Sequence, residues 1–239
     1  MKKVLLYSGG MDSWLIDKIW KPDVKVYVNM HTRYSDEEIK KIKERNEDVQ
    51  IVDFPLGQWE RDDAIIPLRN LYLIMVMCNI TGSEDVDICL GATAGDRVLD
   101  KSPGFVDKAN DLLNYLYQPQ HWIPQGKKVR INIDFKSKTK TQLIKEFVEA
   151  GGNIDEAFKR SFSCYNPQGD KECWQCKPCF RKYVSFKLNG YKFDAETEKT
   201  VIEYLEREII PQIKAGTYGR ADEEKEIMQA YNLYKESKE

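Results

Sequence analysis

The sequence predicts an α/β fold, a Rossmann-like parallel sheet with helices on both faces, followed by a cysteine-rich region and a helical C-terminal tail. Two observations predict this class. Short apolar or β-branched runs alternate with segments of helical periodicity, which is the order that produces parallel strands joined by helical crossovers. The first apolar run also passes directly through two glycines into a helix. Ligands of such sheets bind beyond the carboxyl ends of the strands.

The first elements are a strand at Val4–Tyr7 and a helix at Met11–Trp20, whose apolar residues share one stripe. A β-branched strand is expected at Val24–Asn29. The next helix, Asp36–Glu47, should begin with a capping box formed by Ser35 and Glu38.

The later elements follow the same alternation. A helix that starts at Leu68 is apolar on most faces and should be buried, and glycines end several of the segments. The remaining strands are expected at Val49–Phe54, Val86–Leu90 and Val129–Ile133, and the remaining helices at Leu68–Thr81, Phe105–Tyr117 and Thr139–Ala150.

The composition of the chain excludes several classes of protein. Hydrophobic residues make up 41% and charged residues 32% of the chain, as in soluble globular proteins. The net charge of −2 gives no electrostatic footprint for nucleic acid, so we expect no such partner. No apolar run approaches the roughly 18–20 residues that span a bilayer. The N-terminus enters a strand at once, so we expect no signal peptide, no membrane contact and a cytoplasmic location.

After Gly190 the composition becomes strongly charged. Helices are expected at Asp194–Gln212 and Ala221–Lys235, with widely spaced apolar residues that would pack on the main body or on a second subunit, which leaves a homodimer open. We therefore expect three parts: residues 1–160, 161–190 and 191–239.

The loop Ser8-Gly9-Gly10-Met11-Asp12-Ser13 lies where the first strand turns into the first helix. Glycines allow close approach of the backbone to an anion, and a helix N-terminus favours phosphate. The two serines add hydroxyl donors, and Asp12 can hold magnesium against phosphate oxygens. An ordinary strand–turn–helix corner is the alternative, but the flanking serines and the acid favour a phosphate site. The loop lacks the Walker pattern.

Four cysteines are clustered as C-x8-C-x2-C-x2-C, and the other two, Cys78 and Cys89, should be buried apolar residues. Four thiolates supply a closed tetrahedral zinc site of the structural kind. Disulfides are the weaker alternative in a reducing compartment, and spacing alone does not exclude an iron–sulfur cluster. Nearby cations would offset the charge of a zinc tetrathiolate; they include Arg181 and Lys182. The proposed ligands are Cys164, Cys173, Cys176 and Cys179.

Together these motifs resemble the 7-cyano-7-deazaguanine synthase family of N-type ATP pyrophosphatases, the PP-loop superfamily, over about residues 1–190. The loop at 8–13 resembles the family's Ser-Gly-Gly-x-Asp-Ser loop. Further similar segments are Asp63–Asn70, Ile88–Gly91, Thr139–Leu143, Phe162-Ser163-Cys164-Tyr165 and Cys173–Cys179.

The resemblance implies an adenine nucleotide alpha-hydrolase-like fold and an ATP-dependent carbon–nitrogen ligase. Such an enzyme converts 7-carboxy-7-deazaguanine and ammonia to the nitrile by two dehydrations, each driven by adenylation of an oxygen. The product serves queuosine or archaeosine synthesis or DNA modification. The implied cofactors are ATP, magnesium and zinc.

Site residues are expected on this basis. The ATP-binding set is Tyr7, Ser8, Gly9, Gly10, Met11, Asp12 and Ser13, the catalytic set is Asp12, Ser13 and Lys140, and the substrate-binding set is Arg69, Asn70, Gly91 and Asp96. Arg69 would suit a carboxylate or a phosphate through its bidentate fork. Lys140 would hold phosphates as a point charge. A surface position remains the alternative for both. Neither His31 nor His121 has a clear partner.

The chain also departs from the family pattern. Met30-His31-Thr32-Arg33-Tyr34 stands where the family usually has Tyr-Gly-Gln-Arg-His. Leu68 and Trp174 stand where the family has glycine, and Gln142 replaces an acid. A relative that passes the activated acid to another amine is therefore one alternative. A tRNA-thiolating enzyme of the same ATP chemistry is another, and a nucleotide-binding or zinc-stabilised interaction module is a non-enzymatic one.

Overall fold

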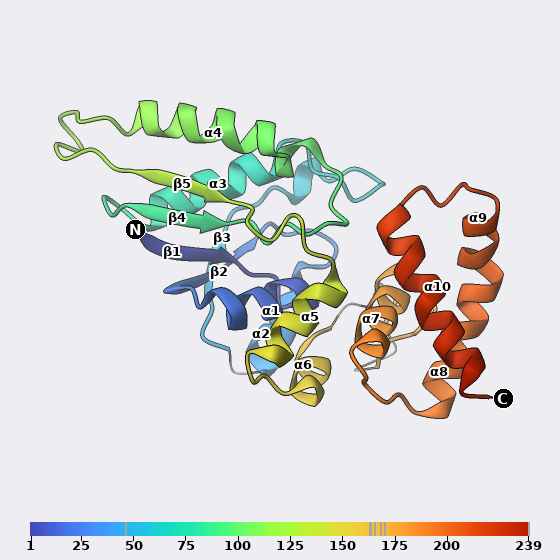
Figure 1. The fold of residues 1–239 in the computed structure, drawn as a ribbon. Helices are drawn as coiled ribbons and strands as arrows, with labels where there is room; N and C mark the ends of the chain where they lie inside the picture. Colours follow the sequence, from blue (N-terminus) through green and yellow to red (C-terminus); the bar gives the residue numbers. More distant parts are fainter. Residues whose placement is uncertain (46, 163, 165, 168, 170, 239) are drawn as a thin grey trace. The chain divides into compact units, whose positions relative to one another are not determined.

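The computed structural model describes residues 1–45, 47–162, 164, 166–167, 169 and 171–238. Its centre is a five-stranded, wholly parallel sheet of order β3-β2-β1-β4-β5, which confirms the expected fold class (Figure 1). Each expected strand is present, within two residues of its predicted bounds. They are β1 (Lys2–Leu6), β2 (Val24–Asn29), β3 (Gln50–Asp53), β4 (Val86–Cys89) and β5 (Val129–Asn132).

The chain divides into two compact units. Unit 1 contains Met1–Gly9 and Ile16–Ser137, and unit 2 contains Gly10–Leu15 and Lys138–Glu239. The boundary therefore passes through the loop at 8–13 and through α1 (Met11–Trp20).

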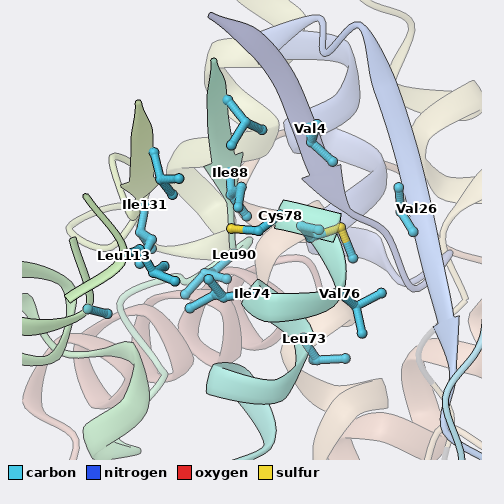
Figure 2. Packing of buried hydrophobic residues seen from close by; sticks show 14 of the residues in the cluster. Val4, Val26, Leu73, Ile74, Val76, Cys78, Ile88, Leu90, Leu113 and Ile131 are labelled. Carbon is cyan, nitrogen blue, oxygen red and sulfur yellow. The ribbon is translucent and has the colours of Figure 1, made fainter. Parts of the chain in front are cut away.

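Unit 1 is the sheet with its covering helices. They are α2 (Ser35–Glu44), α3 (Arg69–Ile80) and α4 (Pro103–Leu116), with single 3₁₀ turns at Gly57–Trp59 and Leu99–Lys101. The core lies between the sheet and the pair α3 and α4 (Figure 2). Val4, Val26 and Ile88 from three adjacent strands face Ile74 of α3, and all four side chains are fully buried. The apolar stretch expected to be a buried helix is thus the main cover of one face of the sheet.

The capping box predicted for α2 is wrong. The helix begins at Ser35 itself, because the preceding Tyr34 already has helical φ and ψ. The Ser35 hydroxyl accepts from the Thr32 backbone N–H at 2.9 Å, in a tight turn that buries the serine. The carboxylate of Glu38 instead accepts from the Tyr27 hydroxyl at 2.7 Å. A tertiary hydrogen bond has therefore displaced the local one.

Unit 2 holds the remaining helices. They are α5 (Lys140–Glu149), α6 (Ile154–Arg160), α7 (Lys177–Leu188), α8 (Ala195–Tyr204), α9 (Ile210–Lys214) and α10 (Ala221–Glu236), with a π-helical turn at Leu205–Ile209. The helix expected at 194–212 is thus interrupted. Pro211 lacks an N–H and its ring displaces the carbonyl of Arg207, which widens that turn.

A second core joins α7 to the C-terminal helices. Its fully buried members include Phe180 and Tyr183 of α7, Leu205 of the π-helical turn and Ala230 of α10. The charged tail therefore packs one face inward, as its widely spaced apolar residues predict. Among the described residues, no helix is both long enough and apolar enough to cross a membrane.

Candidate active site and metal centre

The loop between β1 and α1 has the geometry of a strand-to-helix turn. Tyr7 directly follows β1, and its N–H still donates to Val26 O of the neighbouring strand at 2.8 Å. Gly9 then takes φ +70°, which a side chain would strain, and a Cβ there would lie 3.3 Å from Ile42 Cγ1. Arg45 Nη1 donates to Gly9 O at 2.9 Å. The turn is therefore fixed on the unit 1 side by α2 and the residue that follows it.

The first turn of α1 brings two expected catalytic residues together. Asp12 Oδ2 forms an ion pair with Nζ of Lys140, the first residue of α5, although the two are 128 positions apart. Both lie in unit 2. Asp12 Oδ1 is buried and has no hydrogen-bond partner among the described residues. This carboxylate therefore has one oxygen on a cation and one unmatched oxygen, which fits a site for a second cation such as Mg²⁺.

Ser13 is the third member of the expected catalytic set. Its side chain is almost fully buried, and its hydroxyl donates to Gly10 O at 3.1 Å within the same turn. Tyr7 and Met11, which are expected in the ATP-binding set, are only 1% and 2% exposed. Burial raises the pKa of the Tyr7 hydroxyl. Tyr7 and Met11 can therefore offer a ligand their backbone, while their side chains belong to the core.

Arg69 and Asn70 open α3 in unit 1. The residue before them, Leu68, has φ +59° and ψ 19°, in the left-handed region. Asn70 N donates to Asp100 Oδ2 at 3.1 Å, which caps the helix, while Asn70 Nδ2 is buried with no partner among the described residues. Burial raises the pKa of Glu38, and the positive charge of Arg69 partly offsets that rise. The Arg69 guanidinium therefore already has one carboxylate nearby.

Gly91 and Asp96 belong to the loop that follows β4. Gly91 has φ +62°. The Asp96 carboxylate accepts from Thr93 N at 2.9 Å and from Lys101 Nζ at 3.4 Å. Lys136 Nζ donates to the carbonyls of Thr93 and Asp96. The side chain of Asp96 therefore holds the loop in shape, and any contact with a ligand would compete with these bonds.

His31 has a partner that the sequence did not reveal, which corrects the expectation above. Its Nε2 lies 3.1 Å from Asp53 Oδ1, and Asn29 Nδ2 donates to the same oxygen at 2.6 Å. The parallel register places Asn29 opposite Asp53 at the carboxyl ends of β2 and β3. A Cβ at Gly57 would lie 2.1 Å from the His31 carbonyl oxygen, so glycine is required there. Only the sheet topology brings these residues together.

The four clustered cysteines converge on one point in unit 2. Their Sγ atoms all lie within 4.8 Å of one another. Zinc–sulfur bonds of about 2.3 Å give tetrahedral sulfur separations of about 3.8 Å, so a small contraction would close the site on one ion. Cys176 is the N-cap of α7 and Cys179 lies in its first turn, whereas Cys164 and Cys173 come from the preceding loop. These residues could therefore hold a metal.

Backbone donors and crowding agree with a cation at this point. Cys164 Sγ accepts from the N–H groups of Asn166 and Cys173 at 3.3 and 3.2 Å. Burial raises the pKa of Cys173 to about 11, and contact with Cys176 followed by burial raises the pKa of Cys179. Four thiols this close cannot all ionise unless a cation compensates their charge.

Two of the cations expected to offset the cluster have acidic partners instead. Lys182 Nζ lies 2.7 Å from Glu172, and Arg181 Nε lies 2.9 Å from Glu223. Ser163 and Tyr165, part of the motif around the first cysteine, lie outside the described residues.

Comparison with known proteins identifies the family. Residues 47–190, more than half of the chain, match the family model described as "Queuosine biosynthesis protein QueC". The chain belongs to this family, which confirms the resemblance drawn from its motifs. The matched segment contains Arg69, Gly91, Lys140 and the four clustered cysteines, and it begins after the loop at 8–13.

Named relatives are similar over most of their length. The 7-cyano-7-deazaguanine synthase 1 of Colwellia psychrerythraea is 24% identical over 220 residues, which cover 79% of this chain and 95% of that protein. The 7-cyano-7-deazaguanine synthase of Pseudoalteromonas translucida is 25% identical over 229 residues, 82% of this chain and 99% of that protein. The 7-cyano-7-deazaguanine synthase of Rickettsia africae is 25% identical over 227 residues, which cover 79% of this chain and 95% of that protein.

Proposed function

We propose that the protein is an ATP-dependent ligase that converts 7-carboxy-7-deazaguanine and ammonia to 7-cyano-7-deazaguanine. The observation that carries the proposal is membership of the QueC family, together with relatives named for this product. The Ser8–Ser13 loop adds an element suited to ATP at the N-terminus of α1.

The proposed reaction makes two dehydrations at one carbon. ATP first transfers AMP to the carboxylate and releases pyrophosphate, and ammonia then displaces AMP to give the amide. A second ATP transfers AMP to the amide oxygen, again with release of pyrophosphate. Loss of AMP and a proton leaves the nitrile. Each turnover therefore consumes one ammonia and two ATP.

The chain's own residues would divide this work. The ATP-binding loop would hold phosphates through backbone N–H groups, with Lys140 as a fixed positive charge at Asp12. Asp12 would hold magnesium through its buried Oδ1, and the metal would neutralise phosphate charge. Arg69 would pair with the substrate carboxylate, and Asn70 would donate from its buried Nδ2. Gly91 and the loop held by Asp96 would form the wall of the substrate pocket.

Three functional parts follow from this proposal. Residues 1–160 would carry the ATP chemistry, residues 161–190 would bind zinc through Cys164, Cys173, Cys176 and Cys179, and residues 191–239 would support them. Zinc would be structural, because four protein thiolates leave no open position for a substrate.

Product analysis tests the proposal. The protein is incubated with ATP, magnesium, ammonium and 7-carboxy-7-deazaguanine, and products are followed by mass spectrometry and nucleotide chromatography. We expect the nitrile, AMP and pyrophosphate. Supplying the amide should give nitrile with about half the ATP consumption, because one activation remains. ADP and phosphate as products would refute the chemistry. Adenylation of the acid without nitrile, despite ample ammonium, would indicate another acceptor amine.

A further inference from the structure

The C-terminal helix α10 reaches the start of α5 through one carboxylate. Glu226 Oε1 accepts from the Thr139 hydroxyl and Glu226 Oε2 accepts from the Thr141 hydroxyl, both at 2.7 Å. These two threonines flank Lys140, the lysine that pairs with Asp12. All of these residues belong to unit 2. Nothing in the sequence near residue 226 indicates this contact, which joins positions 85 and 87 residues apart.

We propose that Glu226 is a positioning residue for Lys140. This inference rests on the proposed function, in which the lysine contacts the phosphates of ATP. A lysine side chain has a long flexible stem, so the place of its ammonium depends on how firmly its backbone is held. Hydroxyls on both sides of Lys140 are tied to one carboxylate, and Asn189 Nδ2 adds a hydrogen bond to Thr141 O at 3.0 Å.

The bond network around the carboxylate strengthens this hold. Thr139 is the N-cap of α5, and its hydroxyl oxygen accepts from Gln142 N at 3.2 Å while its hydrogen goes to Glu226. Donation to a charged acceptor polarises the hydroxyl and strengthens the cap. The negative charge of Glu226 also lies at the positive end of the α5 dipole.

Glu226 is itself fixed on a rigid element. On the same helix, Ile227 and Ala230 are buried in the second core. One turn earlier, Glu223 pairs with Arg181 of α7 at 2.9 Å and with Arg220 at 3.1 Å. The tail after residue 190 is therefore placed to set the geometry of the α5 N-terminus. This gives the charged C-terminal helices a role in the reaction.

Replacement of Glu226 by alanine removes both hydroxyl contacts without touching the core. We expect kcat for pyrophosphate release to fall about tenfold, because displacement of a charged group by about 1 Å is enough to slow phosphoryl chemistry strongly. Thr141→Val, which keeps the side-chain shape and removes one hydroxyl, should lower kcat less. Glu226→Gln should recover part of the rate, because its Oε1 still accepts one hydrogen bond. Glu236→Ala makes the same charge change at an exposed site of α10 and should leave kcat unchanged.

A double-mutant cycle separates positioning from general stability. The kcat for pyrophosphate release is measured on the full chain with magnesium and saturating ATP, ammonium and 7-carboxy-7-deazaguanine, and melting temperatures are recorded alongside. If Glu226 acts through Lys140, then Glu226→Ala should cause no further loss in a Lys140→Met background. An unchanged kcat in Glu226→Ala, or equal losses in both backgrounds, would refute the positioning role. Absence of AMP release by the wild-type chain would instead refute the proposed function, and this inference with it.

Discussion

Replacement of Lys182 by methionine should destabilise the protein by about 3–5 kcal/mol, the usual effect of removing one partner of a buried ion pair. The Lys182 side chain is 2% exposed, and that of its partner Glu172 is 8% exposed at a separation of 2.7 Å. Lys182 Nζ also donates to Ser161 O at 2.7 Å and to Phe158 O at 3.2 Å. It lies 4.4 Å from the centroid of the Phe158 ring.

The size of this effect follows from what remains after the substitution. Methionine fills much of the space of the lysine stem, so the cavity contribution is small. Glu172 loses the buried counter-charge of Lys182, and two carbonyls lose a donor, each worth about 1–3 kcal/mol if unsatisfied. Glu172 directly precedes Cys173, and Ser161 lies shortly before Cys164. Loss of the lysine should therefore also loosen the cysteine loop and speed metal release.

Urea unfolding of the metal-loaded protein, followed by tryptophan fluorescence, measures the free energy of unfolding. Metal release to a chelator is followed in parallel. Lys182→Met combined with Glu172→Gln should recover much of the lost stability, because the stranded charge is gone. Lys145→Met is the control, since its pair with Glu149 is exposed on both sides and should contribute less than about 1 kcal/mol. A loss below 1 kcal/mol for Lys182→Met, or no recovery in the double variant, would refute the reasoning.

Three further predictions concern the backbone, the metal and the ATP loop. In thermal unfolding, the Leu68→Gly variant should be more stable than the Leu68→Ala variant by about 1 kcal/mol, because Leu68 has φ +59°, which glycine adopts without strain. Inside a helix alanine is the more stable of the two, so a more stable Leu68→Ala variant would contradict the left-handed backbone. Metal analysis of anaerobically purified protein should find about one zinc per chain, and the Cys176→Ser variant should lose both the zinc and stability. Stoichiometric iron and sulfide would overturn the assignment of zinc. Asp12→Asn should lower AMP formation on the order of a hundredfold or more with a nearly unchanged melting temperature, and normal turnover would exclude Asp12 from the reaction.

The sheet could be predicted because its signals are local. Each strand is a short apolar or β-branched run bounded by turn residues, and all five are found within two residues of their expected bounds. Helix ends were harder, since a cap depends on which partner reaches the side chain. Thr139 and Gln142 form a capping box, whereas Ser35 and Glu38, with an equally suitable pattern, do not. In the second case the hydroxyl of Tyr27 takes the glutamate.

The candidate site likewise has parts that the sequence predicts and parts that it does not. The loop at 8–13 and the cysteine cluster are visible in sequence because their residues are close neighbours in the chain. The contacts that hold them are not visible, because each joins distant segments. His31 meets Asp53 only through the parallel register of β2 and β3. The sequence analysis does not predict helix α7, which contains Lys182 and Cys179 and begins directly after Cys176, so it also misses the support of the metal site.

The resemblance to the family leads one to expect glycine at two positions, Leu68 and Trp174, and both have a backbone conformation that favours glycine. Leu68 and Trp174 have φ of +59° and +55°, and positive φ costs a residue with a side chain about 1–2 kcal/mol. Trp174 offsets this cost by stacking on Phe158 at 6.0 Å and packing edge-on against Phe193 at 5.8 Å. Leu68 is 60% exposed and has much less burial to offset it.

Strain that packing does not explain is commonest where a ligand needs a particular backbone. Leu68 is the N-cap of α3, directly before Arg69 and Asn70, and its left-handed conformation sets the direction in which that helix starts. Asn70, two residues after Leu68, is buried, and its Nδ2 has no hydrogen-bond partner in the part of the chain that the structure describes. We therefore propose that the left-handed conformation at Leu68 serves the placement of Arg69 and Asn70 for a ligand rather than the stability of α3. At Trp174 the aromatic contacts give a sufficient structural reason.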